Sequence, residues 1–456
     1  MSQDAPAAFA SEQQTLDMLS NLIAKARKAG ADAADAIFVN GVSLSHAQRL
    51  GKIEKLERSE GSDLGLRVLV GKRQAIVSSS DLGPRALDAL VERVVAMART
   101  VPDDPHCGLA DPDQVFRGPI PDLEICDTSE PAPESLIERA SKAEDAARQV
   151  PGVTNSEGAE ASWGQTRVAL AASNGFAGGY SISRQSIGVA VLAGEGTGME
   201  RDYEFSSAVF TEDLEDPVAV GRIAGERAVK RLNPRKVGTQ KVPVVFDPRV
   251  SNGLLRHLAG AINGSAIARG TSFLKDSMGK QILPAALSVI DDPHRKRGMA
   301  SKPFDAEGLA NESIALIEDG VLKSWVLDLR SARQLGLASI GRASRGTSAP
   351  PSPSTTNLYL PAGTITREAL LGDIKSGLYV NELMGFGVNA VTGDYSRGAS
   401  GFWIDNGELA YPVSEVTIAG NLKDMFLNML PADDLEFRYA VNAPTVRIDG
   451  LTIAGN

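Results

Sequence analysis

The amino-acid sequence predicts an α+β fold in which the sheets are mainly antiparallel. Two observations carry this prediction. In the first half of the chain, a helical segment, several strand-like runs and a second helical segment follow one another, and this order occurs twice. In the second half, short strand-like runs are separated by Asp-Gly and Asn-Gly pairs, which are typical of hairpin turns.

The first helix–strands–helix unit begins at about residue 12. Apolar residues at helical spacing predict a helix over residues 12–30, with Gly30 as its C-terminal cap. Runs that alternate apolar and polar residues then predict an antiparallel sheet with one covered face. These strands are expected over residues 36–40, 42–50, 64–70 and 74–78. Asp81 and Pro84 mark the start of a second amphipathic helix.

The second unit follows a connector rich in Pro and Asp, residues 101–133, which we interpret as an irregular loop. A helix is predicted over residues 133–149 and another over residues 216–232. The strands between them are expected over residues 157–162, 166–172, 177–185, 186–192 and 203–210. This unit therefore repeats the plan of the first.

The chain is expected to divide into two domains near Asn233-Pro234. Residues 1–235 would form an N-terminal α/β domain built from the repeated unit, and residues 236–456 a C-terminal antiparallel β-rich domain. The similar segments Gly65–Gly71 and Gly188–Gly194 indicate an internal duplication. Its two copies would be about residues 12–100 and 133–233.

The second half is predicted to be rich in short strands. They are expected over residues 288–291, 315–318, 321–326, 358–360, 378–383, 388–391, 401–405, 408–410 and 445–448. Asp319-Gly320 and Asn406-Gly407 are expected to form hairpin turns. The segment GTSAPPSP, residues 346–353, is expected to be an exposed or ligand-facing loop.

Composition excludes several classes of function. A net charge of −10 argues against nucleic-acid binding, which needs a basic surface. No apolar run approaches the ~18 residues of a membrane span, and the N-terminus lacks the basic and apolar regions of a signal peptide. We therefore expect a cytoplasmic protein without nucleic-acid or membrane partners. Its two cysteines, Cys107 and Cys126, are expected to be reduced.

Three segments of the second half carry a resemblance to a known family: Leu255–Gly264, Asp276–Ile282 and Val391–Glu408, the last continuing to Met425. They resemble the TldD/PmbA family, and within it the PmbA branch, also called TldE. The family is also labelled modulator of DNA gyrase. The resemblance implies an N-terminal α/β domain and a C-terminal β-rich domain around an enclosed cleft.

The resemblance also implies a cytosolic protease system in which TldD and TldE form a heterodimer that trims unfolded peptides. In TldD, zinc is held by the two His of a His-Glu-x-x-x-His helix motif and by a Cys near the C-terminus. The Glu of this motif acts on the zinc-bound water. This chain would then belong with a TldD-like partner.

The corresponding helix of this chain lacks the zinc ligands. It is predicted to follow the apolar strand around Val244 and to start at Asp247-Pro248, with the motif positions early in the helix. Arg256 stands at the first His, His257 at the Glu and Ala261 at the second His. Arginine stays protonated and alanine has no donor, whereas a hydrolytic zinc needs three protein ligands. Shifting the register by one residue is no better, and residues 438–444 contain no Cys.

We therefore expect no metal site and no catalytic residue in this chain, with zinc held by the TldD-like partner. Arg256 and His257 are candidates for the wall of a cleft shared with that partner. Alternatively, His257 is a half-buried polar residue on a packed helix. The same face carries Gly253, Gly260, Ala261 and Gly264, so a strand or a substrate backbone is expected to approach it closely.

Two further segments are candidate cleft residues. Asp394, Tyr395 and Arg397 either contact a bound peptide, or form a tight turn in which Asp394 is a cap and Arg397 pairs with a carboxylate. Thr356 and Asn357 follow the Pro-rich loop, and a similar Thr-Asn segment borders the cleft of the TldD proteins that this chain resembles. An ordinary strand start is the other interpretation of that pair.

The function expected from the residues and the resemblance together is a PmbA/TldE-like subunit of a TldD/TldE-type zinc metalloprotease that degrades or trims unfolded peptides. Such peptides could bind by adding an extended strand to a sheet edge. Two alternatives remain open: a homodimer that binds peptides without cleaving them, and a self-sufficient hydrolase with a different metal or nucleophile.

Overall fold

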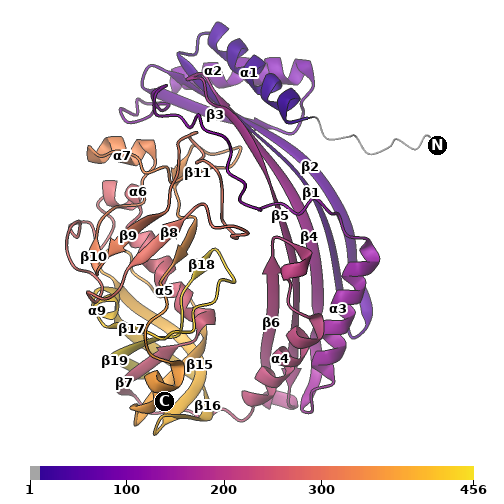
Figure 1. The fold of residues 1–456 in the computed structure, drawn as a ribbon, viewed down its shortest axis with the longest axis vertical. Coiled ribbons are helices and arrows are strands. Elements are labelled where there is room, and N and C mark those ends of the chain that lie inside the picture. Colours follow the sequence, from indigo (N-terminus) through magenta and orange to yellow (C-terminus); the bar gives the residue numbers. More distant parts are fainter. Residues whose placement is uncertain (1–10, 456) are drawn as a thin grey trace.

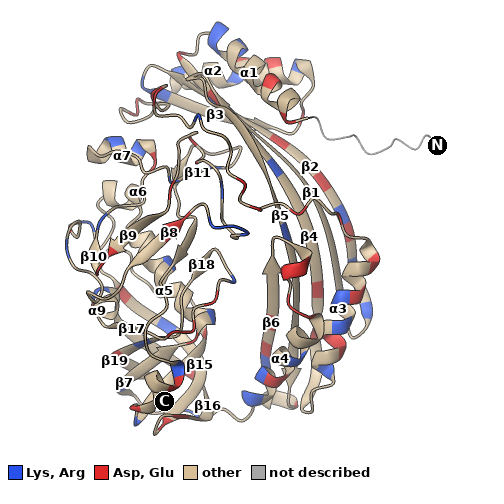
Figure 2. Cartoon of the chain, viewed as in Figure 1, with Lys and Arg blue, Asp and Glu red and all other residues tan. Residues whose placement is uncertain are grey.

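The computed structural model describes residues 11–455 and places them in two adjoining halves (Figure 1). A long curved sheet with four helices forms the N-terminal half, and three sheets of six, five and two strands with five helices form the C-terminal half. Charged residues of both signs are spread over both halves (Figure 2). The α+β fold class is confirmed.

The N-terminal sheet has six strands, and every neighbouring pair is antiparallel. The strands are β1 (Ala33–Arg49), β2 (Lys52–Val70), β3 (Arg73–Ser79), β4 (Val153–Ala172), β5 (Ala177–Ala193) and β6 (Glu200–Ala208). Their order across the sheet is β3-β2-β1-β4-β5-β6, so two three-stranded meanders meet at β1 and β4. The repeated helix–strands–helix unit is therefore a property of the fold.

Two helices flank each meander and lie on the sheet. They are α1 (Glu12–Lys28), α2 (Pro84–Thr100), α3 (Pro133–Arg148) and α4 (Pro217–Lys230), with two 3-10 turns, η1 (Gly196–Gly198) and η2 (Thr211–Asp213), in the second unit. Each helix buries its apolar stripe against the sheet, which gives one apolar core per unit. The helix starts at Pro84, Pro133 and Pro217 agree with the predicted starts, since proline is well tolerated at the first helical position.

The strands of this sheet are longer and fewer than predicted. The runs expected over 36–40 and 42–50 are one strand, β1, and β4 and β5 likewise each join two expected runs. The Asn40-Gly41 step, where the sequence predicts a break, stays extended because Asn40 donates a hydrogen bond to Ser62 Oγ on β2 (2.7 Å). A cross-strand partner thus keeps a polar residue inside a long strand.

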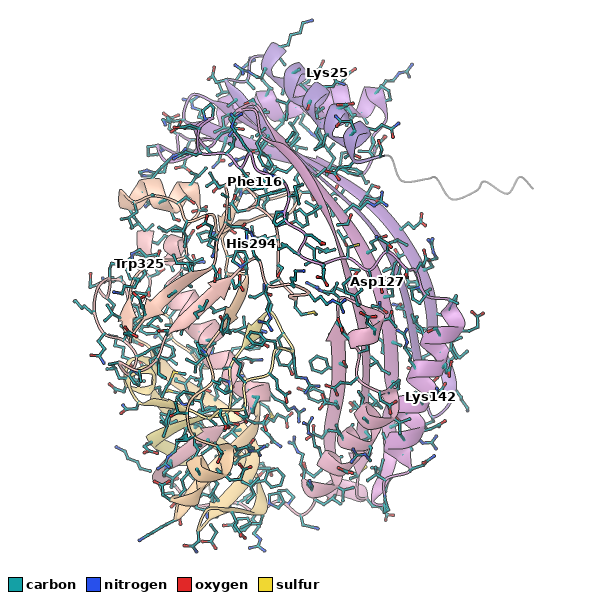
Figure 3. The ribbon with its side chains drawn as sticks, in the orientation of Figure 1. Lys25, Phe116, Asp127, Lys142, His294 and Trp325 are labelled. Atoms are coloured by element: carbon teal, nitrogen blue, oxygen red, sulfur yellow. The ribbon has the colours of Figure 1, made fainter. Side chains whose placement is uncertain are left out.

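The connector between the two units is irregular, as predicted, and lies between the halves. Val115 forms an isolated bridge with Leu309 of the C-terminal half. Phe116, labelled in Figure 3, packs against Phe304, with ring centroids 6.2 Å apart. These contacts belong to an apolar cluster that joins the connector and the C-terminal half to the face of the N-terminal sheet that lies opposite its four helices.

In the C-terminal half, five strands close into a ring in the order β16-β15-β14-β7-β19, because β16 also pairs with β19. A second sheet has the order β10-β9-β8-β13-β18. The strands are β7 (Gln240–Phe246), β8 (Val289–Asp292), β9 (Ile314–Glu318), β10 (Val321–Leu322), β11 (Ala343–Ser344), β12 (Ser352–Pro353), β13 (Asn357–Tyr359), β14 (Ser376–Met384), β15 (Asp394–Asp405), β16 (Glu408–Asn421), β17 (Met429–Pro431), β18 (Val441–Asn442) and β19 (Val446–Ala454). The helices are α5 (Pro248–Ala261), α6 (Gly264–Ala268), α7 (Leu329–Leu335), α8 (Arg367–Gly372) and α9 (Leu422–Leu427).

Three details of this half differ from the prediction. Two strand pairs, β7 with β14 and β13 with β18, are parallel rather than antiparallel. The run expected over 321–326 is a strand only as far as Leu322. Residues 388–391 form a turn instead of a strand, because the side chain of Asn389 accepts hydrogen bonds from the amides of Val391 (2.9 Å) and Thr392 (3.3 Å).

The Pro-rich loop, residues 346–353, and the residue before it connect the two halves. Arg345 reaches β1 and forms an ion pair with Asp35, which also accepts a hydrogen bond from Arg67 Nε (2.9 Å). Burial opposes ionisation of Asp35, but the guanidinium groups of Arg345 and Arg67 hold its pKa below the ordinary value. The main chain of Thr347 lies directly against Gly65 of β2, where a larger residue would overlap it.

Two expectations concern membranes and export. None of the helices within residues 11–455 has the length and apolar character needed to cross a membrane. The expectation that the chain carries no signal peptide rests largely on residues 1–10, which lie outside the described residues.

Candidate functional site

The candidate site is built on α5, which the sequence positions directly above the ring of strands. Strand β7 is apolar and buried between β14 and β19, and α5 follows it after a single residue, Asp247. The Asp247 carboxylate caps the helix by accepting from the amide of Arg249 (2.9 Å), and Tyr379 donates to its other oxygen (2.6 Å). Residues 256–261 therefore occupy the second half of α5, not its early part as predicted.

One face of α5 is packed and the other is open. Ser251, Leu254, Leu255, Leu258 and Ala261 are buried, whereas Arg256 and Gly260 are exposed and His257 is half-buried. A Cβ atom at Gly253 or at Gly260 would meet nothing within 4 Å. No strand of the described residues therefore approaches these two glycines, and the approach of a substrate backbone stays a prediction. Gly264 is closely packed, against Val326 and Ser331.

His257 lies against Tyr395 of β15, with ring centroids 6.0 Å apart and an interplanar angle of 78°. Burial, and to a smaller extent the charge of Arg397, lowers the pKa of His257 below its usual value of 6.5. Its imidazole is therefore neutral at pH 7, with one nitrogen that donates and one that accepts. The Tyr395 ring is buried, its hydroxyl has no hydrogen-bond partner among residues 11–455, and burial raises its pKa to about 12.

Asp394 and Arg397 flank Tyr395 but make separate contacts. Asp394 is exposed and accepts from Thr392 Oγ1 (2.6 Å) and Asn421 (3.1 Å), which lowers its pKa. Arg397 donates from Nε to the main-chain carbonyl of Met384 (3.0 Å), and no carboxylate of the described residues forms an ion pair with it. Because alternate residues of a strand point to opposite faces, Tyr395 and Arg397 share the α5 side and Asp394 does not.

Thr356 and Asn357 lie at the start of β13, a strand that contacts α5. The Asn357 amide donates to the carbonyl of Asp292 (2.7 Å) and to Ser301 Oγ (2.8 Å), and its oxygen accepts from the amide of Ala300 (2.8 Å). Its hydrogen-bonding capacity is thus used within the fold. Thr356 is buried and its hydroxyl has no partner among the described residues.

The residues at the zinc-motif positions do not fit a zinc ion. Of Arg256, His257 and Ala261, only His257 offers a ligand atom. Among residues 11–455, no group of three or more His, Cys, Asp or Glu side chains lies close enough together to hold a metal. His294 is engaged with Asn311 (2.9 Å) and Cys107 is buried in the connector.

A second feature, missed by the sequence analysis, is a groove between α4 and the ring of strands. It consists of two adjoining cavities of about 390 and 570 Å³ that share Arg227, Asp247 and Arg367. Arg367 stacks over the ring of Tyr379 at 4.8 Å, and the side-chain oxygen of Asn381 is buried without a partner among the described residues. These residues come from α4, the α5 cap, α8 and β14. No sequence spacing could have grouped them.

Comparison with known proteins assigns the family. Profiles of the PmbA/TldA metallopeptidase match in chain order: domain 1 at residues 34–98, the central domain at 126–232 and the C-terminal domain at 239–455. Metalloprotease PmbA of Escherichia coli O157:H7 is 39% identical over 93% of this chain and 92% of its own length. The chain belongs to the PmbA/TldD metallopeptidase family.

A further relative agrees with this chain in sequence, and two solved structures agree with it in fold. A metalloprotease PmbA homologue of Haemophilus influenzae is 38% identical over 98% of this chain and 97% of its own. A crystal structure described as a modulator of DNA gyrase from Bacteroides thetaiotaomicron superposes with a TM-score of 0.90 at 26% identity, over 98% of this chain and 100% of that one. TldE from Thermococcus kodakarensis, at 21% identity, shares the fold, with a TM-score of 0.86 over 96% of this chain and 100% of its own.

Proposed function

We propose that this chain is the PmbA/TldE-type subunit of a two-chain zinc metalloprotease that cleaves unfolded peptides, with a TldD-like partner that supplies the zinc. The observation that carries the proposal is which residues α5 has at the positions of the zinc motif. A helix in the position of the zinc motif presents Arg256, His257 and Ala261, which cannot supply two ligands and a carboxylate base.

The retained helix has properties that suit a substrate wall. Its open face carries glycines, so an extended peptide backbone can lie close to it. The neutral, half-buried His257 offers hydrogen bonds to peptide groups, and Arg256 adds an exposed positive charge. In this role the chain binds and orients the peptide, and a zinc ion held by the partner would supply the chemistry that activates a water for attack.

Metal analysis and a peptidase assay on the purified chain test the proposal. We expect far less than one zinc per chain and no cleavage of a disordered peptide, with cleavage appearing when a TldD-like protein of the same organism is added. Near-stoichiometric zinc together with cleavage by the chain alone would overturn it. Peptide binding without cleavage even in the mixture would instead support the homodimeric peptide-binding protein.

A further inference from the structure

The larger of the two groove cavities, about 570 Å³, lies where the two halves of the chain meet (Figure 1). Arg227 and Lys230 of α4 line it from the N-terminal half, and Arg367 of α8 lines it from the C-terminal half. Most of the remaining lining comes from β14, β15 and β16 of the ring. A cavity of this volume is typical of sites that bind small molecules.

A β-bulge turns a polar side chain toward this cavity. Asn381 is the extra residue of β14, since the residues on either side of it pair with two adjacent residues of β15. A bulge leaves the extra residue unpaired and re-aims its side chain, and bulges are frequent next to active sites. The amide nitrogen of Asn381 is not buried and makes no hydrogen bond to any other residue of 11–455. Its N–H groups are therefore open to a ligand.

Two charged groups of this cavity are already satisfied within the fold. Arg227 forms an ion pair with Glu204 of β6. Asp247 accepts a hydrogen bond from the amide of Arg249 (2.9 Å) on one oxygen and from the hydroxyl of Tyr379 (2.6 Å) on the other. These two groups therefore do not determine which ligand the cavity takes.

Two positive charges of the cavity remain available. Lys230 and Arg367 form no ion pair with a carboxylate of the described part of the chain. Arg367 is half-buried, and its guanidinium stacks over the Tyr379 ring at 4.8 Å, which restricts its orientation. Lys230 is exposed at the last position of α4. Because guanidinium and ammonium groups form charge-assisted hydrogen bonds with carboxylates, the cavity fits an anionic group.

The smaller cavity, about 390 Å³, has available charges of the opposite sign. Glu368, Asp433 and Glu436 line it, and none of the three forms an ion pair within residues 11–455. Arg249 and Arg438 line the same cavity, but each is paired with an acidic residue of the N-terminal half. Like charges repel one another, so an anion is directed away from this cavity and into the larger one.

An apolar surface lies in the larger cavity beside the positive charges. It is formed by Phe402, Leu409 and Tyr411. Leu409 is 40% exposed, and the two aromatic rings are half-buried, so all three are only partly covered by the fold. A ligand that covers them carries an apolar group close to its anion. The C-terminal residue of a peptide combines a carboxylate with a side chain and a preceding carbonyl group.

We propose that this cavity binds the C-terminal residue of a peptide. The terminal carboxylate pairs with Arg367 and Lys230, the preceding carbonyl accepts from Asn381, and an apolar side chain covers Phe402 and Leu409. The proposal rests on the proposed function in one respect, since it takes peptides as the ligands of this chain. It adds a preference for peptides with a free carboxyl end on an apolar residue.

Calorimetric titration of the purified full chain with two synthetic peptides tests this proposal. The probe is acetyl-Ala-Ala-Phe with a free carboxylate, and the matched control is the same peptide with a C-terminal amide. We expect the free acid to bind at least about tenfold more tightly, because the amide lacks the charge-assisted hydrogen bonds. The titration needs neither a partner nor cleavage, so its failure is distinguishable from failure of the proposed function.

Variants of Arg367 place the binding in the cavity. Arg367→Met removes the charge but keeps a long side chain, and it is expected to weaken binding of the free acid about tenfold while leaving the amide unchanged. Arg367→Lys keeps the charge and should retain most of the affinity. Arg222→Met is the matched control, because Arg222 lies on α4, pairs with Glu226 and does not line the cavity. Circular dichroism checks that each variant is folded.

Several results would overturn the proposal. They are equal binding of the two peptides, no binding of either at millimolar concentration, and equal weakening by Arg367→Met and Arg222→Met. If Arg367→Met does not fold, the comparison of acid with amide on the wild type and on Arg367→Lys still decides. Inorganic phosphate is the third probe. Phosphate binding without binding of the free acid would assign the cavity to a phosphate ligand and overturn the proposal.

Discussion

His257 on α5 packs edge to face against Tyr395 on β15, with ring centroids 6.0 Å apart. This contact joins the helix that carries Arg256, His257 and Ala261 at the zinc-motif positions to a strand of the ring. It combines a neutral imidazole with a buried hydroxyl that has no partner among residues 11–455. The buried Tyr395 ring packs against the helix, and the half-buried His257 is the member of the pair that can contact a peptide.

Removal of the Tyr395 hydroxyl tests whether this group contributes to the packing between α5 and β15. Tyr395→Phe is expected to leave the free energy of unfolding within about 1 kcal/mol of the wild type, because a buried polar group without a partner does not stabilise the fold. Tyr395→Ala is expected to lower it by about 3–5 kcal/mol through loss of the ring. Urea unfolding measures both. A loss of several kcal/mol in Tyr395→Phe would show that the hydroxyl is bonded within the fold.

The pH dependence of stability reports the environment of His257. In the unfolded chain its imidazole titrates near 6.5, whereas burial and Arg397 lower its pKa in the fold. As the pH falls below 6.5, the unfolded state takes up a proton that the folded state resists, so the free energy of unfolding decreases. The decrease ends once the pH is below the folded pKa.

The variant His257→Gln lacks this titration. Its free energy of unfolding is expected to fall less between pH 7 and pH 5 than that of the wild type, as measured by urea unfolding at each pH. Arg397→Gln removes a positive charge near the imidazole and is expected to give an intermediate decrease. Equal decreases in the wild type and His257→Gln would contradict the assigned environment.

The junction between the halves depends on Gly65. A Cβ atom there would overlap the main chain of Thr347, so Gly65→Ala is expected to lower the free energy of unfolding by about 1–3 kcal/mol. Gly61 lies on the same strand with nothing within 4 Å of its Cβ position, and Gly61→Ala should change stability by no more than about 0.5 kcal/mol. Chemical denaturation measures the free energy of unfolding of both variants. Equal effects would show that the main chain of Thr347 moves away from the added methyl group at no cost in stability.

Much of the fold could be predicted because its signals are local. The four long helices begin at Pro or capping residues and carry apolar stripes. The bounds predicted for α1, α3 and α4 lie within two residues of the structure, and α2 starts at Pro84, one of its two predicted start residues. The Asp319-Gly320 and Asn406-Gly407 turns are found with positive φ at all four residues, as a hairpin of this type requires.

Other features depend on contacts that the sequence does not contain. The apolar pattern of a long strand is interrupted by polar residues such as Asn40, but the strand continues because Ser62 of another strand accepts a hydrogen bond from Asn40. The turn at residues 388–391 has the composition of a strand, and hydrogen bonds to the side chain and main chain of Asn389 stabilise the turn. The groove at Asp247, Arg227 and Arg367 is assembled from segments far apart in the chain. The candidate residues around Tyr395 could be selected from the sequence, but the sequence could not predict which of their side chains point toward α5.

The central claim is that this chain contributes binding and the partner contributes the metal chemistry. The most direct measurement is peptide cleavage by two mixtures. The first contains the His257→Ala variant of this chain and a wild-type TldD-like partner. The second contains the wild-type chain and a partner in which the Glu of the His-Glu-x-x-x-His motif has been replaced. Loss of a general acid–base group lowers rates about 10²–10⁴-fold, so we expect that loss only in the second mixture and less than about tenfold in the first. An equal loss in both mixtures would contradict the claim, since His257 would then act in the chemistry.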